Sequence, residues 1–216
     1  QELHLKQGDV VGIQLPNSLH YPIAVFAIWK AGLVVTNINP LYTAKELRDQ
    51  LKDCKAKLLI ARDVFVQNAL DVVYELNMNL IVANMKDFFQ FPMGMMIDIK
   101  HSKDSTTPDI PYQTFTHALV QGEKTLERFV PVQHPVALYQ YTGGTTGKSK
   151  GAVIKHSSLI AVIKMAQDML QAYSDRFAIQ AGDTVLTALP MYHIFAFNFN
   201  FLLFFSQGGH NILIQI

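Results

Sequence analysis

A glycine-rich segment in the second half of the chain offers the clearest chemistry. It reads Tyr141, Thr142, Gly143, Gly144, Thr145, Thr146, Gly147, Lys148, Ser149, Lys150, Gly151 and Ala152. Glycines let the backbone bend sharply and approach a ligand without a Cβ in the way. Threonine hydroxyls and lysine ammonium groups donate hydrogen bonds to anions, and consecutive N–H groups in such a turn form an anion-binding concavity. The segment is therefore predicted to bind a polyphosphate.

The spacing of this loop differs from the Walker A motif of P-loop NTPases. That motif places four residues between its first glycine and its Gly-Lys pair, whereas only three separate Gly143 from Gly147. The residues that follow, 152–155, have the composition of a strand, and a Walker loop opens a helix. A plain glycine turn would not account for three threonines and two lysines. We therefore predict a phosphate-binding loop at 142–151 that joins two strands.

A second candidate segment is Pro190-Met-Tyr-His-Ile-Phe195, expected in a loop or at a helix start. His193 could donate a hydrogen bond to a carboxylate or phosphate oxygen without carrying a permanent charge, although a single histidine is more often structural. The aromatic run from Phe195 to Phe205 has the composition of a protein core and equally of an apolar pocket for an acyl chain.

Strands and helices alternate along most of the chain. Strands are predicted at 9–15, 33–37, 57–61, 80–83, 136–141, 152–155 and 184–188, and helices at 19–31, 44–53, 64–76 and 158–173. Thr43 and Glu46 form a capping box at the start of the second helix. This alternation predicts an α/β fold with a mostly parallel sheet. The stretch 85–127 breaks the rhythm and is predicted to be a surface excursion with an apolar lip.

Composition excludes several classes of protein. A net charge of +1 gives no basic surface for a phosphate backbone, so nucleic acid is not expected as a partner. Cys54 is the only cysteine, which excludes an internal disulfide and suggests a small buried thiol in a reducing compartment. The eight histidines show no metal-ligand spacing, so no metal site is expected.

The loop resembles the phosphate-binding signature of the adenylate-forming superfamily. Its Thr-Gly is followed by two residues and Lys-Gly, filled here by Thr146-Gly147 and Lys150-Gly151. Ser149 stands where many members carry proline, a mild departure. Two further stretches, 32–47 and 189–195, are similar to the long-chain fatty acyl-CoA synthetases (fatty acid–CoA ligases) of bacteria. The similarity spans nearly the whole chain and is weakest at 86–128.

This resemblance implies an enzyme that uses ATP to convert a long-chain fatty acid to an acyl-adenylate and then to acyl-CoA. ATP, Mg²⁺ on its phosphates, and coenzyme A as co-substrate would be needed. Residues 141–152 would bind the nucleotide, Lys150 and His193 would be catalytic, and His193 and Phe195 would contact the fatty acid. An aryl- or other acyl-CoA ligase, and a non-catalytic nucleotide- or acyl-binding fragment, are the alternatives.

The chain lacks an initiating methionine and ends on an apolar, strand-like run, which predicts a partial large N-terminal domain of the adenylate-forming fold. We expect a first α/β subdomain at 1–135, with a surface excursion at about 86–128. Residues 136–216 would hold the phosphate-loop strand pair and the start of the acyl-pocket region. Such a piece is expected to be inactive alone and to self-associate through apolar surface. A cytoplasmic location is expected, with peripheral contact to the inner face of the cytoplasmic membrane left open.

Overall fold

A seven-stranded sheet organises the chain in the computed structural model, which describes residues 3–89, 92–94, 96, 108–125, 135–142, 149–173 and 178–214. The strand order is β5-β4-β3-β1-β2-β6-β7. The strands are β1 Val10–Gln14, β2 Val34–Asn37, β3 Leu58–Arg62, β4 Asn79–Ala83, β5 Gln113–Thr114, β6 Val136–Thr142 and β7 Lys150–Lys155. Neighbours in the sheet are parallel except β6 and β7, which are antiparallel. The predicted α/β fold with a mostly parallel sheet is confirmed.

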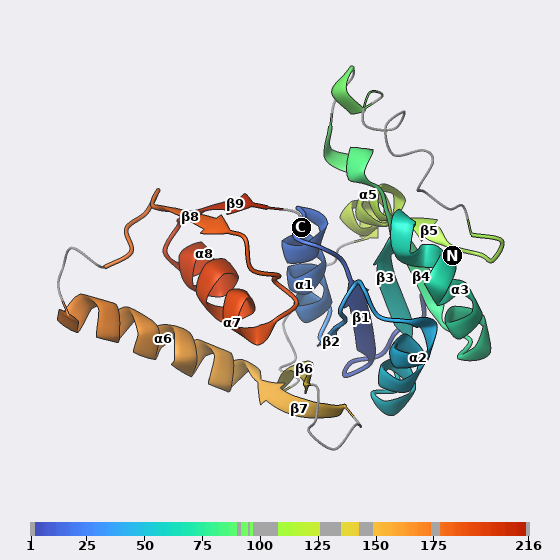
Figure 1. The fold of residues 1–216 in the computed structure, drawn as a ribbon, viewed down its shortest axis with the longest axis horizontal. Helices are drawn as coiled ribbons and strands as arrows, with labels where there is room; N and C mark the ends of the chain where they lie inside the picture. The colour runs from blue at the N-terminus through green and yellow to red at the C-terminus, as the bar shows by residue number, and fades with distance from the viewer. Residues whose placement is uncertain are drawn as a thin grey trace.

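Helices cover both faces of this sheet (Figure 1). They are α1 His20–Lys30 and α5 Phe115–Thr125 on one face, and α2 Ala44–Asp53 and α3 Val66–Glu75 on the other. Side chains alternate between the two faces, so Val11 and Ile13 pack with the α1 cluster whereas Val10 packs with the α2 cluster. Both faces are buried, which explains why β1 and β3 read as near-continuous apolar runs.

The helix boundaries follow from local chemistry. The Thr43 hydroxyl accepts a hydrogen bond from the Glu46 N–H, and the Glu46 carboxylate accepts from the Thr43 N–H at 2.9 Å. The predicted capping box is thereby confirmed, and α2 has the predicted bounds. Helix α1 ends before Gly32, whose φ of 72° lies in the left-handed region that glycine adopts without strain.

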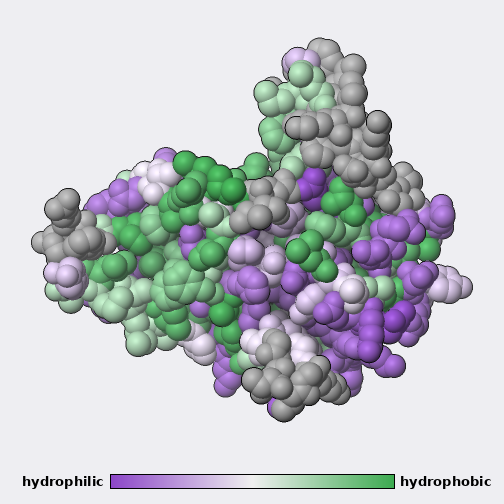
Figure 2. Space-filling view, in the orientation of Figure 1, coloured by the Kyte–Doolittle hydropathy of each residue, from purple (hydrophilic) through white to green (hydrophobic). Residues whose placement is uncertain are grey.

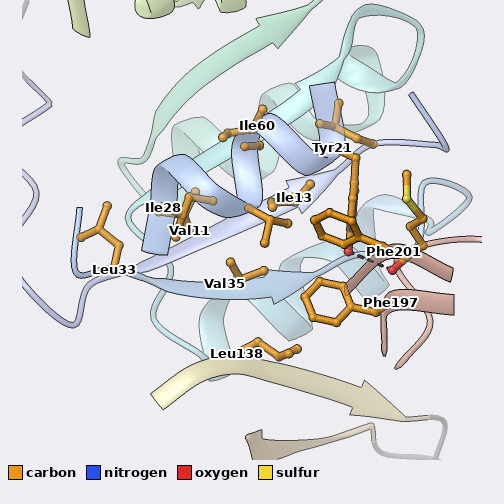
Figure 3. Packing of buried hydrophobic residues seen from close by; sticks show 14 of the residues in the cluster. Val11, Ile13, Tyr21, Ile28, Leu33, Val35, Ile60, Leu138, Phe197 and Phe201 are labelled. Atoms are coloured by element: carbon orange, nitrogen blue, oxygen red, sulfur yellow. Dashed lines mark hydrogen bonds between the residues drawn. The ribbon is translucent and has the colours of Figure 1, made fainter. Parts of the chain in front are cut away.

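The part of the chain after β7, here called the second half, lies beside this sheet (Figure 1). It begins with α6 His156–Tyr173, and it contains a two-stranded parallel sheet of β8 Thr184–Thr187 and β9 His210–Leu213. Between these strands runs a continuous helix of three parts, α7 Ile194–Ala196, the π-helical segment η4 Phe197–Leu203, and α8 Phe204–Ser206. Phe197 and Phe201 of η4 pack edge-on against Tyr21 of α1 (Figure 3). One apolar cluster therefore joins the two halves.

The stretch 85–127, where no element was predicted, contains a further strand and helix. The short 3-10 turn η2 Met85–Phe88 opens this stretch, and β5 extends the sheet beside β4; a similar turn, η1 Asp63–Phe65, precedes α3. Phe115, the first residue of α5, is buried in the core. The imidazole of His20 lies 3.0 Å from the Asp87 carboxylate, between the rings of Phe88 and Phe115. This buried pair attaches the start of the excursion to α1.

Apolar side chains gather on the surface of the second half, whereas polar side chains cover α2 and its surroundings (Figure 2). The exposed apolar residues there include Ile160, Met165, Met169 and Tyr173 of α6, and Leu186 and Ile212 of the small sheet. Patches of this kind mark surfaces that another segment or a partner covers. Within the described residues, no helix combines the length and apolar character needed to cross a membrane.

Candidate functional site

The glycine-rich loop connects two antiparallel strands, as the sequence predicts. Thr142 at the end of β6 pairs with Lys150 at the start of β7, and Tyr141 pairs with Gly151. The residues after the loop form strand β7, which runs from Lys150 to Lys155, whereas a Walker loop leads into a helix. The middle of the loop, Gly143, Gly144, Thr145, Thr146, Gly147 and Lys148, lies outside the described residues. Their contacts with a nucleotide stay a prediction.

The two ends of the loop are held by local contacts. The Ser149 hydroxyl donates a hydrogen bond of 3.0 Å to the Thr142 carbonyl. A Cβ added to Gly151 would lie 2.8 Å from Cζ of the Tyr141 ring, so only glycine lets the ring cross β7 here. The side chains of Lys150 and Ala152 are exposed on this edge strand, which leaves the Lys150 ammonium free to meet an anion.

Tyr141 is itself anchored from the opposite side. Its hydroxyl donates a hydrogen bond of 2.5 Å to the carboxylate of Asp53, the last residue of α2. Burial raises the pKa of Tyr141, and the bond to the Asp53 carboxylate raises it further, because both disfavour the phenolate. Tyr141 is therefore a neutral donor whose ring fixes the position of Gly151.

The His193 segment forms a turn that leads into a helix, which agrees with the predicted helix start. The His193 N–H donates to the Pro190 carbonyl at 3.0 Å, and the His193 carbonyl accepts from the Phe197 N–H at 2.9 Å. The imidazole is exposed and packs against the Tyr192 ring, with 4.5 Å between ring centroids. Phe195 is 56% exposed and contacts Phe199, so its ring is available to an apolar ligand.

Buried side chains of the sheet connect this segment to the strand that carries the loop. The Gln140 amide of β6 donates to the Tyr192 carbonyl at 3.2 Å and accepts from Asn37 of β2 at 3.1 Å. The Tyr21 hydroxyl lies 2.7 Å from the Asn37 side-chain oxygen and 2.9 Å from the Met191 carbonyl, and shares its proton between them. Burial raises the pKa of Tyr21 well above its usual value, so the hydroxyl stays protonated.

These contacts place both candidate segments at one edge of the sheet. Asn37 ends β2, Gln140 lies two residues before the end of β6, and Asn17 follows β1. Ligands of open α/β sheets bind at the carboxyl ends of the strands. The His193 segment lies beside β6 near that end, and β6 ends at Thr142, where the loop begins. The sequence analysis missed Asn17, Tyr21, Asn37 and Gln140 as site residues. For Asn37 and Gln140, the available signal was an amide side chain within an otherwise apolar strand.

The described residues offer hydrogen-bond donors and a cation for phosphate, but no carboxylate cage. In this part of the chain no three His, Cys, Asp or Glu side chains come together as metal ligands.

The chain belongs to the AMP-binding enzyme family, which matches residues 1–216. It is 37% identical to the long-chain-fatty-acid–CoA ligase of Salmonella typhimurium over 99% of this chain and 38% of that protein. It is 28% identical to 4-coumarate–CoA ligase 3 of Arabidopsis thaliana over 99% of this chain and 34% of that protein.

A solved structure has the same fold. The anthranilate CoA ligase AuaEII in complex with anthranoyl-AMP superimposes with a TM-score of 0.78 at 19% identity, over 99% of this chain and 36% of that one. The chain spans less than two fifths of the length of each of these relatives.

Proposed function

We propose that the protein to which this chain contributes is an AMP-forming ligase for long-chain fatty acids. The fatty acid carboxylate attacks the α-phosphate of ATP, forming an acyl-adenylate and releasing pyrophosphate. The thiol of coenzyme A then displaces AMP to give acyl-CoA. The single observation that carries this proposal is the 37% identity to a long-chain-fatty-acid–CoA ligase over 99% of the chain. The hydrogen bond from Gln140, close to the end of the strand that leads into the phosphate loop, to the Tyr192 carbonyl supports it.

The proposal gives each candidate residue a role that its position allows. Residues 141–152 hold the ATP phosphates, with Tyr141 acting on the loop through Gly151. The exposed Lys150 ammonium stabilises charge that develops on the departing pyrophosphate, and such a contact raises the rate when it strengthens in the transition state. His193 donates to the fatty acid carboxylate or the α-phosphate, and Phe195 contacts the acyl chain. Coenzyme A has no assigned residue in this chain.

The main alternative is a ligase for aromatic acids, favoured by the 28% identity to a 4-coumarate–CoA ligase. The test is to incubate the whole protein with ATP, Mg²⁺, coenzyme A and acids of graded length, beside 4-coumarate and benzoate. We expect AMP and pyrophosphate as products, with acyl-CoA formed fastest from long-chain fatty acids. Faster reaction with the aromatic acids would replace the substrate assignment. Formation of ADP, or no product with any acid, would refute the ligase proposal.

Cellular location and self-association belong to the same proposal. The buried free thiol of Cys54 suits the reducing cytoplasm. Phe89, Met93 and Met96 are exposed on the protruding part of the chain, and they would contact lipid if the protein binds the inner face of the cytoplasmic membrane. The apolar surface of α6 would favour self-association of the 216-residue chain. Sedimentation with and without phospholipid vesicles measures both self-association and lipid binding. A chain that sediments as a monomer and does not bind the vesicles would exclude both.

A further inference from the structure

Asn17 makes an unusual set of contacts with the segment that carries His193. Its amide nitrogen donates to the carbonyls of Thr187 and Leu189, each at 3.0 Å. Its side-chain oxygen accepts from the Met191 N–H at 2.8 Å. The side chain is 7% exposed, and its partners lie 170 or more positions away in the sequence. Both amide hydrogens and the oxygen of one buried side chain therefore serve a single distant segment.

The segment needs such a partner because it leaves its own sheet at this point. β8 ends at Thr187, and Pro190 has no N–H to donate. The Thr187 carbonyl still accepts from the Ile214 N–H at 3.1 Å. Beyond it, Asn17 supplies the partners of the Leu189 carbonyl and the Met191 N–H. The His193 N–H donates to the Pro190 carbonyl at 3.0 Å. The position of His193 therefore depends on the position of this turn.

Asn17 is also well placed to hold the segment rigidly. It lies between the end of β1 at Gln14 and the start of α1 at His20, directly after Pro16, whose ring restricts the backbone. Further along, Tyr21 donates to the Met191 carbonyl and Gln140 donates to the Tyr192 carbonyl. Asn17 is thus the first of three anchors along this stretch, and it makes three of the hydrogen bonds.

We infer that Asn17 is a positioning residue that sets the location of His193 at the carboxyl ends of β1, β2 and β6. What His193 contacts rests on the proposed function, but the positioning itself does not. A buried group that loses its partner costs more than an average hydrogen bond contributes. Loss of the Asn17 side chain therefore releases the 187–193 segment while β1 and β2 keep their pairing.

Hydrogen exchange tests the positioning without any activity assay. In Asn17→Ala we expect a peptide covering 187–193 to exchange at least tenfold faster, whereas a peptide covering β2 changes less than twofold. Gln50→Ala is the matched control, because it removes two buried hydrogen bonds, to Thr36 and Asn37, that do not touch the segment. That variant should leave exchange at 187–193 unchanged. Asn17→Asp sets an oxygen against two carbonyl oxygens and should also accelerate exchange there, which keeps the test available if Asn17→Ala does not fold.

Kinetics of the whole protein supply the second readout. We expect Asn17→Ala to raise the KM for the fatty acid about tenfold in pyrophosphate exchange, with the KM for ATP changed less than twofold. A simple loss of folded protein would change neither KM. If amide hydrogen exchange at 187–193 is unaltered in Asn17→Ala, or rises only as much as it does in β2, the inference is wrong. If the wild-type protein uses no fatty acid, the proposed function fails. The hydrogen-exchange data still decide the role of Asn17.

Discussion

Gly151→Ala tests the contact that links the phosphate loop to the body of the sheet. The added Cβ would lie 2.8 Å from Cζ and 2.9 Å from Cε2 of the Tyr141 ring. Carbon atoms pack at about 3.5–4.0 Å, so the ring must move by most of an ångström. The ring cannot move freely, because its hydroxyl is bonded to Asp53 and its face belongs to the α2 cluster.

The magnitude follows from three opposing contributions. Replacing glycine by alanine inside a strand stabilises by about 0.5–1 kcal/mol when there is space for the methyl group. Overpacking a filled site costs about 1–3 kcal/mol. Weakening the bond from Tyr141 to the exposed Asp53 carboxylate costs about 0.5–1 kcal/mol more. We therefore expect Gly151→Ala to destabilise the chain by about 1–3 kcal/mol.

Urea unfolding followed by circular dichroism measures this change, and Gly122→Ala is the matched control. No atom lies within 4 Å of a Cβ placed on Gly122 in the exposed part of α5, so that substitution should stabilise by about 0.5–1 kcal/mol. With an m-value of ~2 kcal/mol/M, the midpoint for Gly151→Ala should fall by about 0.5–1.5 M. If both variants shift the midpoint upward, the Tyr141–Gly151 contact does not constrain the loop as described.

Three further predictions concern single side chains. In the whole protein, Lys150→Ala should raise the activation free energy of fatty-acid-dependent pyrophosphate exchange by about 2–4 kcal/mol. Lys148→Ala should raise it less. A near-wild-type rate of pyrophosphate exchange in Lys150→Ala would overturn the role of Lys150. Burial raises the pKa of the Cys54 thiol to about 11, so the unfolded chain loses this proton first, and the thiol should lower stability on the order of 2 kcal/mol from pH 9 to 11. In urea unfolding, Cys54→Ala should remove this contribution and leave the one from Tyr21 and Tyr141, whose pKa values are also raised by burial. Asp87→Ala leaves the buried His20 imidazole without its partner and should cost about 2–3 kcal/mol of unfolding free energy, whereas an unchanged midpoint would show that the pair is not structural.

Local patterns in the sequence were sufficient for most of the sheet. β1 and β3 are buried on both faces, so their apolar runs stand out from the helices around them. α2 carries its own start signal in Thr43 and Glu46. By contrast, β5 has two residues and pairs with β4. Two residues are too few to show the alternation of apolar and polar side chains that predicts a strand. The π-helical turn of η4 likewise depends on packing against α1 rather than on a local motif.

The candidate site divides in the same way. The phosphate loop could be located because several glycines, threonines and lysines fall together in one short segment. The residues that place His193 could not, because Asn17 and Met191 are 174 positions apart and an asparagine after Pro16 suggests only a turn. Gln140 and Asn37 are also separated by 103 positions. Their role depends on which strands become neighbours, and a single sequence does not specify that.

The parallel pairing of β2 with β6 also has a consequence for synthesis on the ribosome. Thr36 of β2 meets Tyr139 of β6 across 103 positions, so at ~5–20 residues per second the partner strand emerges about 5–20 s after β2. During that interval β2 is the unpaired edge of a nascent four-stranded sheet, with its backbone N–H and C=O groups open to any passing strand. Closing so long a loop is also slow. The newborn chain is therefore most vulnerable to mispairing at β2, and a chaperone that shields this edge until β6 appears would raise the yield of folded protein.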